Sequence, residues 1–134
     1  LRALLGTRLE IAVGVDDAIL EGVDAGATGW VAGLVNAFPA ESAALFRHAT
    51  AGQKDEALAL YRWFLPLLRM DTVPKFVQLI KLVQAEVGRG TTTVRPPRLE
   101  LEGAELDEAL AVIRGQLAQR DAVAEATIGS ARRR

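Results

Sequence analysis

Two short apolar runs near the start of the chain predict a pair of parallel β-strands. Residues 9–13 have strand length, are partly β-branched and are closed by Gly14. Residues 30–35 form a second run that is apolar on both faces, as is typical of a parallel strand covered on each side. Between them, residues 16–26 begin with carboxylates and end with glycine, which predicts a helix. The pattern therefore indicates a strand, helix and strand unit with a right-handed crossover.

After Pro39 the apolar residues recur with helical spacing. Pro39 suits the first turn of one helix, which we expect to end at Gly52. A second helix is predicted over residues 53–68, with Tyr61 at a core-facing position. Pro66 is expected to kink or tighten the last turn of that helix.

Two further helices and a tail complete the pattern. Thr72 is expected to cap a third helix that ends at Gly88. Residues 90–97 then form an extended connection, and a last helix is predicted over residues 104–119. Residues 121–134 show no apolar period and end in three arginines, so we expect a disordered tail.

Composition narrows the classes of partner. The chain has 134 residues, half of them apolar and a quarter charged, which fits one globular unit with its own core. Sixteen basic residues against 17 acidic ones argue against nucleic acid or an anionic membrane as partner. The absence of cysteine excludes disulfides and thiol nucleophiles and fits a cytoplasmic location. No apolar run approaches the roughly 20 residues that span a bilayer.

The two predicted strands need more protein around them. A pair of parallel strands can neither close a barrel nor protect its own edges. The first six residues also lack an initiating Met and the order of a signal peptide. We therefore expect an upstream segment that supplies the rest of the sheet.

A series of short features follows the predicted elements in order. They are Gly14-Val15-Asp16-Asp17, Gly26-Ala27-Thr28-Gly29, Val31, Asn36, Pro39, Gly52, Leu65-Pro66-Leu67, Lys81 seven residues before Gly88, and Val94-Arg95-Pro96-Pro97. Each is common alone, but together and at this spacing they resemble the C-terminal end of the dihydrodipicolinate synthase and N-acetylneuraminate lyase family. The resemblance covers about residues 1–118.

This resemblance implies an α/β fold: strands seven and eight of a TIM (β/α)8 barrel, followed by a C-terminal helical appendage. The last two β/α units would occupy residues 1–52 and the helical region residues 53–120. The family consists of class I aldolases, lyases that form a Schiff base with pyruvate or a related 2-keto acid. It implies no cofactor and no metal, and it implies a homo-oligomer.

Barrel enzymes carry their sites at the C-terminal ends of the strands. The resemblance accordingly implies substrate binding by Gly14, Asp16, Val31 and Asn36. Purely structural roles are the alternative for these residues, because Asp16 is also suited to helix capping and Asn36 to a hydrogen bond with its own loop backbone.

The covalent machinery is not expected in this chain. In the family the reactive lysine lies on the sixth strand, more than a dozen residues before the position of Gly14, and no lysine precedes Gly14 here. The proton-relaying tyrosine also lies on an earlier strand, so Tyr61 is not its counterpart. We expect a small 2-keto acid and the missing N-terminal barrel half as partners. The alternative is a non-catalytic half-barrel fragment or an assembly or regulatory subunit.

Other residues refine the substrate and the surface. Residues 32–34 offer no hydroxyl for a polyol tail, which favours a smaller substrate. The string from Gly29 to Pro39 resembles the branch with hydroxyproline-pathway deaminases and other keto-acid lyases. We expect His48 to be a surface residue, and Trp30 and Trp63 to be packing residues.

Overall fold

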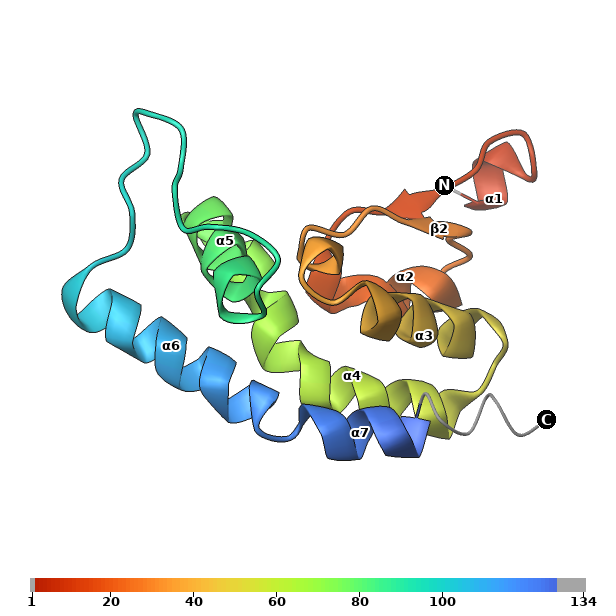
Figure 1. Cartoon of the computed structure of the whole chain (residues 1–134). Coiled ribbons are helices and arrows are strands. Elements are labelled where there is room, and N and C mark those ends of the chain that lie inside the picture. Colours follow the sequence, from red (N-terminus) through yellow and green to blue (C-terminus); the bar gives the residue numbers. More distant parts are fainter. Residues whose placement is uncertain (1, 128–134) are drawn as a thin grey trace.

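The computed structural model describes residues 2–127, in which two very short strands lie among helices and most of the helices follow the second strand (Figure 1). The elements are α1 (Arg2–Leu5), β1 (Ala12–Val13), η1 (Asp16–Ala18), α2 (Ile19–Asp24), β2 (Gly29–Trp30), η2 (Leu34–Asn36), α3 (Pro39–Thr50), α4 (Lys54–Leu68), η3 (Arg69–Thr72), α5 (Phe76–Glu86), α6 (Gly103–Leu117) and α7 (Arg120–Thr127), where η denotes a 3-10 turn. Within the described residues, no helix combines the length and the apolar character needed to cross a membrane.

The parallel pairing of the strands is confirmed, but both strands are shorter than predicted. Ala12 lies opposite Gly29 and Val13 opposite Trp30. The prediction of strand over residues 30–35 is wrong beyond Trp30, because the chain turns into η2, where the Leu34 backbone N–H donates to the carboxylate of Asp16. That hydrogen bond joins residues 18 positions apart in the sequence, so the apolar run alone cannot reveal it.

Helices α3 and α4 follow the prediction closely. Gly52 separates them with a φ of 70°, a left-handed conformation that glycine adopts without a side-chain penalty. Pro66 sits in the last turn of α4, and the backbone tightens directly afterwards into η3.

The predicted cap of the third helix is wrong. The Thr72 hydroxyl donates to the carbonyl of Arg69 within η3, and α5 begins only at Phe76. Val73 is extended, with φ of −115° and ψ of 159°, because the following Pro74 disfavours a helical conformation at the preceding residue. Residues 90–97, which were predicted as an extended connection, form neither helix nor strand and include a turn at Pro96 and Pro97.

The expectation of a disordered tail fails for residues 121–127, which continue from Arg120 as α7. Arg120 Nε lies 2.6 Å from Oε1 of the buried Glu41, and its guanidinium group lies 5.1 Å from the centre of the Phe38 ring. Val123 also packs against the core. These contacts reach back about 80 residues, which a search for local apolar periodicity does not detect. Residues 128–134, with the three arginines, lie outside the described residues.

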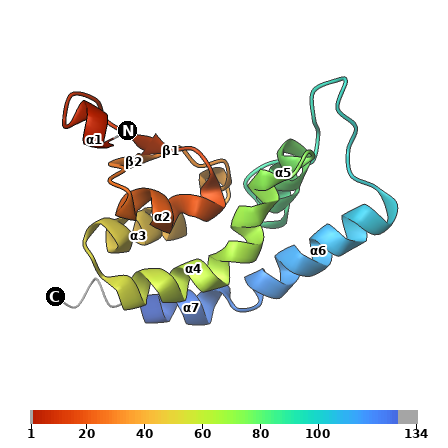
Figure 2. The same ribbon diagram turned by 180° about the vertical axis from the view of Figure 1, so that it is seen from behind.

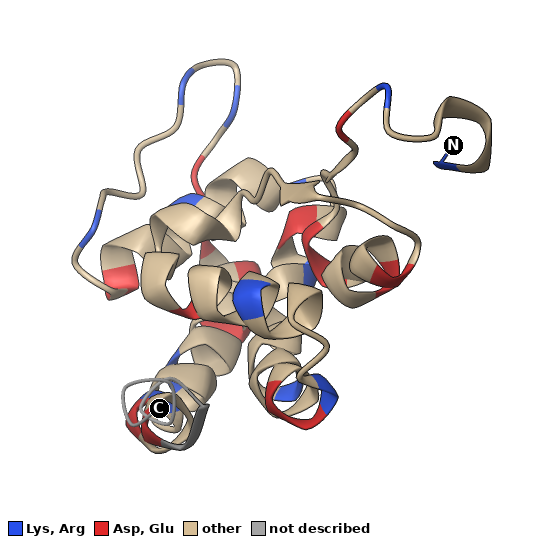
Figure 3. Cartoon of the chain, turned by 90° about the vertical axis from the view of Figure 1, so that its right-hand side faces the viewer, with Lys and Arg blue, Asp and Glu red and all other residues tan. Residues whose placement is uncertain are grey.

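Helix α4 is the centre of the packing, with α3 on one side and α7 on the other (Figures 1 and 2). Phe38, Trp63 and Phe64 form an aromatic cluster with two edge-to-face contacts and one stacked contact. The packing role expected of Trp63 agrees with its burial. The surface position expected of His48 is wrong, because the residue is buried and its Nδ1 lies 2.7 Å from Oε1 of Gln53. Basic and acidic residues are spread over the same elements rather than gathered in one patch (Figure 3).

Candidate functional site

The carboxyl ends of the two strands form an open edge. The Val31 backbone N–H donates to the carbonyl of Val13 over 2.9 Å, which continues the strand pairing by one residue and brings Gly14 beside Val31. Val31 is 72% exposed. A Cβ placed on Gly14 would meet no atom within 4 Å, so its backbone is open to an approaching ligand.

Asp16 lies beneath this edge and joins the two segments that leave the strands. Its side chain is fully buried. Oδ1 accepts a hydrogen bond of 3.2 Å from Nε1 of Trp30, and Oδ2 accepts one of 3.0 Å from the backbone N–H of Leu34. The carboxylate thus does not cap the helical turn that begins at Asp16 itself but binds the first backbone N–H of η2. It ties the segment after β1 to the segment after β2.

Burial raises the pKa of Asp16 above its ordinary value. The hydrogen bonds from Leu34, Trp30 and Gly33 favour the charged form and offset part of that rise, while the neighbouring charge of Asp17 adds to it. Loss of hydration is the largest of these effects.

Asn36 stands three residues beyond Gly33 and bonds to its own loop. Its Nδ2 donates to the carbonyl of Gly33 over 3.2 Å, and its side chain is otherwise exposed. The structure therefore brings Gly14 and Val31 together at the surface and places Asp16 underneath. Asn36 lies at the end of η2, and this amide contact shapes the turn.

Two residues of the helical region join this site without a sequence signal for it. The Tyr61 hydroxyl, from α4, donates to the carbonyl of Asp17 over 2.5 Å. Asp71, from η3, lies against Gly33, since a Cβ on Gly33 would be 2.9 Å from Asp71 Oδ1. Burial and the charges of Asp16 and Asp17 raise the pKa of Asp71, and a backbone hydrogen bond from Asp16 opposes the rise. The spacing of these residues along the chain does not indicate that they meet.

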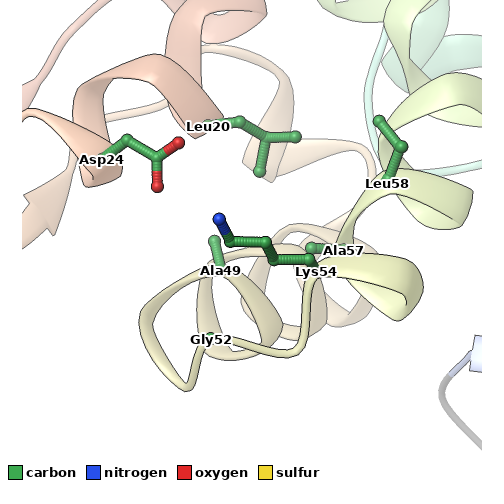
Figure 4. Close-up of a pocket in the computed structure, with 7 residues that line it drawn as sticks. All are labelled: Leu20, Asp24, Ala49, Gly52, Lys54, Ala57 and Leu58. Atoms are coloured by element: carbon green, nitrogen blue, oxygen red, sulfur yellow. The ribbon is translucent and has the colours of Figure 1, made fainter.

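None of the three lysines of the chain belongs to a strand. Lys75 is paired with Glu105 of α6, and Lys81 lies within α5. Lys54 is the first residue of α4 and lines a cavity of about 210 Å³. This cavity opens where α2 and α3 end and α4 begins, with Lys54 extending toward Asp24 (Figure 4). It is at the opposite end of α2 from Asp16. Within residues 2–127, no three or more His, Asp or Glu side chains form a group that could hold a metal ion.

The model of the family described as the dihydrodipicolinate synthetase family matches residues 1–116. The match includes both strands, the open edge and the helices that contribute Tyr61 and Asp71. No curated protein and no solved structure matches this chain.

Proposed function

We propose that this chain, which belongs to the dihydrodipicolinate synthetase family, forms part of the substrate wall of a lyase that acts on pyruvate or a related 2-keto acid. Membership of the family indicates aldolase-type or lyase-type chemistry and suggests a TIM barrel. The finer proposal is that β1 and β2 are the seventh and eighth barrel strands and that α4 to α7 form the helical appendage. The Schiff base would then form on a lysine outside this chain.

The open edge made by Gly14 and Val31 carries this proposal. It lies at the carboxyl ends of parallel strands, which is where barrel enzymes bind their substrates. Glycine at one position leaves room for a ligand beside the backbone, and Val31 offers an apolar side chain next to it. A compact keto acid with a short apolar end suits such an edge.

The acidic residues near this edge disfavour the binding of an anion. The carboxylates of Asp16 and Asp71 lie close to the strand ends, and negative groups repel the carboxylate of a keto acid. We therefore assign Asp16 to positioning the loops. The anion would be held by backbone N–H groups at the strand ends, and in a complete barrel by further residues as well. The homo-oligomeric state and the cytoplasmic location stay predictions.

A second candidate function is a non-catalytic assembly or regulatory subunit. The places of Lys54, Lys75 and Lys81 favour it, because none of these residues belongs to a strand. A Schiff base needs an amine that is neutral enough to attack a ketone, which requires burial or a neighbouring positive charge.

The proposal is tested by titrating the isotopically labelled chain with pyruvate and recording amide shifts by NMR. We expect pyruvate to shift the amides of Gly14 and Val31, and we expect Val31→Phe to abolish these shifts. Val112→Phe is the matched control, since it enlarges a partly exposed valine on α6. Absence of shifts at the strand ends, or shifts that survive Val31→Phe, would sink the proposal.

Borohydride reduction in the presence of pyruvate separates the two candidates from a complete enzyme. We expect mass spectrometry to find no pyruvyl adduct on any of the three lysines, because none of them belongs to a strand. A stoichiometric adduct would show that the chain carries its own nucleophile and would refute the account of a partial site.

A further inference from the structure

Side chains from the helical region contact the segment that follows β1 and hold it in place. Tyr61 on α4 donates to the carbonyl of Asp17 across 44 residues of sequence. The turn η3 contacts η1, which begins at Asp16, and Asp71 on η3 lies close enough to the Asp16 backbone for that backbone to lower its pKa. The segment after β1 is therefore contacted by residues that come from α4 and from the turn after it.

The segment after β2 is closed by the same region. A Cβ on Gly33 would lie 2.9 Å from Oδ1 of Asp71 and 2.7 Å from Cδ1 of Ile80 on α5. Real Cβ atoms essentially never show such short separations, so η3 and α5 pack directly on the backbone of Gly33. The absence of a side chain at this position makes the approach possible.

We propose that Tyr61 and Asp71 are positioning residues, which hold the segment after β1 and, through Asp16, set the loop that carries Val31. This inference rests on the proposed function for the role of Val31 and deepens it. The helical region is then the part of the chain that determines the shape of the strand-end edge. Without it, the two-residue strands offer few bonds to fix the loops that leave them.

The chemistry of the contact argues for a role beyond filling space. An apolar side chain in the place of Asp71 would avoid both the loss of hydration and the repulsion from Asp16 and Asp17 that raise its pKa. A carboxylate at this position instead offers an acceptor to the backbone of Asp16. Tyr61 likewise adds a directed hydrogen bond to a side chain that is already partly packed against the core.

Amide hydrogen exchange tests whether the contacts of Tyr61 and Asp71 with the segment after β1 also stabilise the loop after β2. The reporter is the N–H of Leu34, which donates to Asp16 but to neither Tyr61 nor Asp71. We expect Tyr61→Phe and Asp71→Ala each to speed its exchange on the order of tenfold, because the loss of either contact loosens the segment that carries Asp16. Asp71→Asn keeps an acceptor and should preserve the protection found in the unchanged chain.

Two controls distinguish local loosening of the loop at Leu34 from a general loss of stability. Thr72→Ala alters the neighbouring exposed residue of η3, whose hydroxyl bonds only within the turn, and it should leave Leu34 unchanged. The amide of Phe64, in the middle of α4, reports global opening. Equal acceleration at Phe64 and Leu34, or no acceleration at Leu34, overturns the proposal.

Pyruvate titration of the same variants distinguishes this inference from the proposed function. Weaker pyruvate shifts at Val31 in Tyr61→Phe and Asp71→Ala, restored in Asp71→Asn, support the positioning role. Undiminished shifts in the two former variants overturn it. A further outcome is that pyruvate shifts no amide in the unchanged chain while the exchange of Leu34 responds as expected. In that case the proposed function fails, and the positioning of the loop by Tyr61 and Asp71 is supported.

Discussion

Replacement of Asp16 by asparagine tests the part of the site that the structure defines best. The two side chains have nearly the same shape, but Asp16 accepts hydrogen bonds at both oxygens and asparagine has a single acceptor. The NH2 group of the asparagine would have to face either Nε1 of Trp30 or the N–H of Leu34. Either choice sets a donor against a donor inside the protein.

The expected cost follows from that mismatch. A buried donor left without a partner costs about 1–3 kcal/mol, and removal of a poorly hydrated charge offsets part of this. We therefore expect Asp16→Asn to destabilise the chain by about 1–2 kcal/mol at neutral pH. For a chain of this length the melting temperature should fall by roughly 3–10 °C.

Thermal melts followed by circular dichroism and by tryptophan fluorescence measure this effect. Asp17→Asn is the matched control, because no hydrogen bond to the Asp17 side chain appears among the described contacts and its backbone carbonyl stays available to Tyr61. It should change the free energy of unfolding by no more than about 0.5 kcal/mol. If the two variants melt together, Asp16 does not hold the loops and our assignment of its role is wrong.

The dependence on pH has a definite sign. The folded pKa of Asp16 lies above its unfolded value near 3.8, so the folded state binds the proton more tightly. The contribution of this group to stability is full below the unfolded pKa and is lost as pH rises through the folded pKa. The gap in stability between the unchanged chain and Asp16→Asn should therefore widen as pH falls from neutral toward about 4. A gap that narrows over this range would contradict the raised pKa.

Three further substitutions separate surface, core and tail. Val31→Phe should change the free energy of unfolding by less than about 0.5 kcal/mol in a denaturant titration, because Val31 is exposed; a large loss would show that it is a packing residue. Ile80→Ala should cost about 2–5 kcal/mol in the same assay, since Ile80 is buried and packs on the Gly33 backbone, and a cost under 1 kcal/mol would contradict that packing. Arg120→Gln should cost about 1–3 kcal/mol, a range reduced for the partial exposure of Arg120, because it leaves the Glu41 carboxylate buried without its cation; restoration of stability by adding Glu41→Gln would support this cause.

The helices that carry their own start and stop residues were predictable. Pro39, Gly52 and the apolar spacing of α4 act locally, so the sequence indicates these elements without knowledge of their neighbours. The parallel strand pair was predictable for the same reason, since two apolar runs flank a helix of suitable length. Strand ends and the start of α5 were not, because contacts from distant residues and the restriction before Pro74 decide them.

The candidate site divides in a similar way. The resemblance to the family directed attention to Gly14, Asp16, Val31 and Asn36, and the structure shows how these residues lie. Whether they bind substrate stays a prediction. The sequence does not indicate that Asp16 is buried with both oxygens occupied, because an aspartate before a helix reads equally well as a cap.

By itself, the sequence determined the order and type of the main elements and, through the order of its residues, the family. These depend on periodicity, capping and residue order, which act over short stretches of chain. Only the tertiary structure decided that Tyr61 and Asp71 reach the strand ends and that Arg120 secures α7. Each of those contacts joins residues more than 35 positions apart. The packing of α4 against η1, η3 and α7 brings them together, and no local pattern encodes that packing.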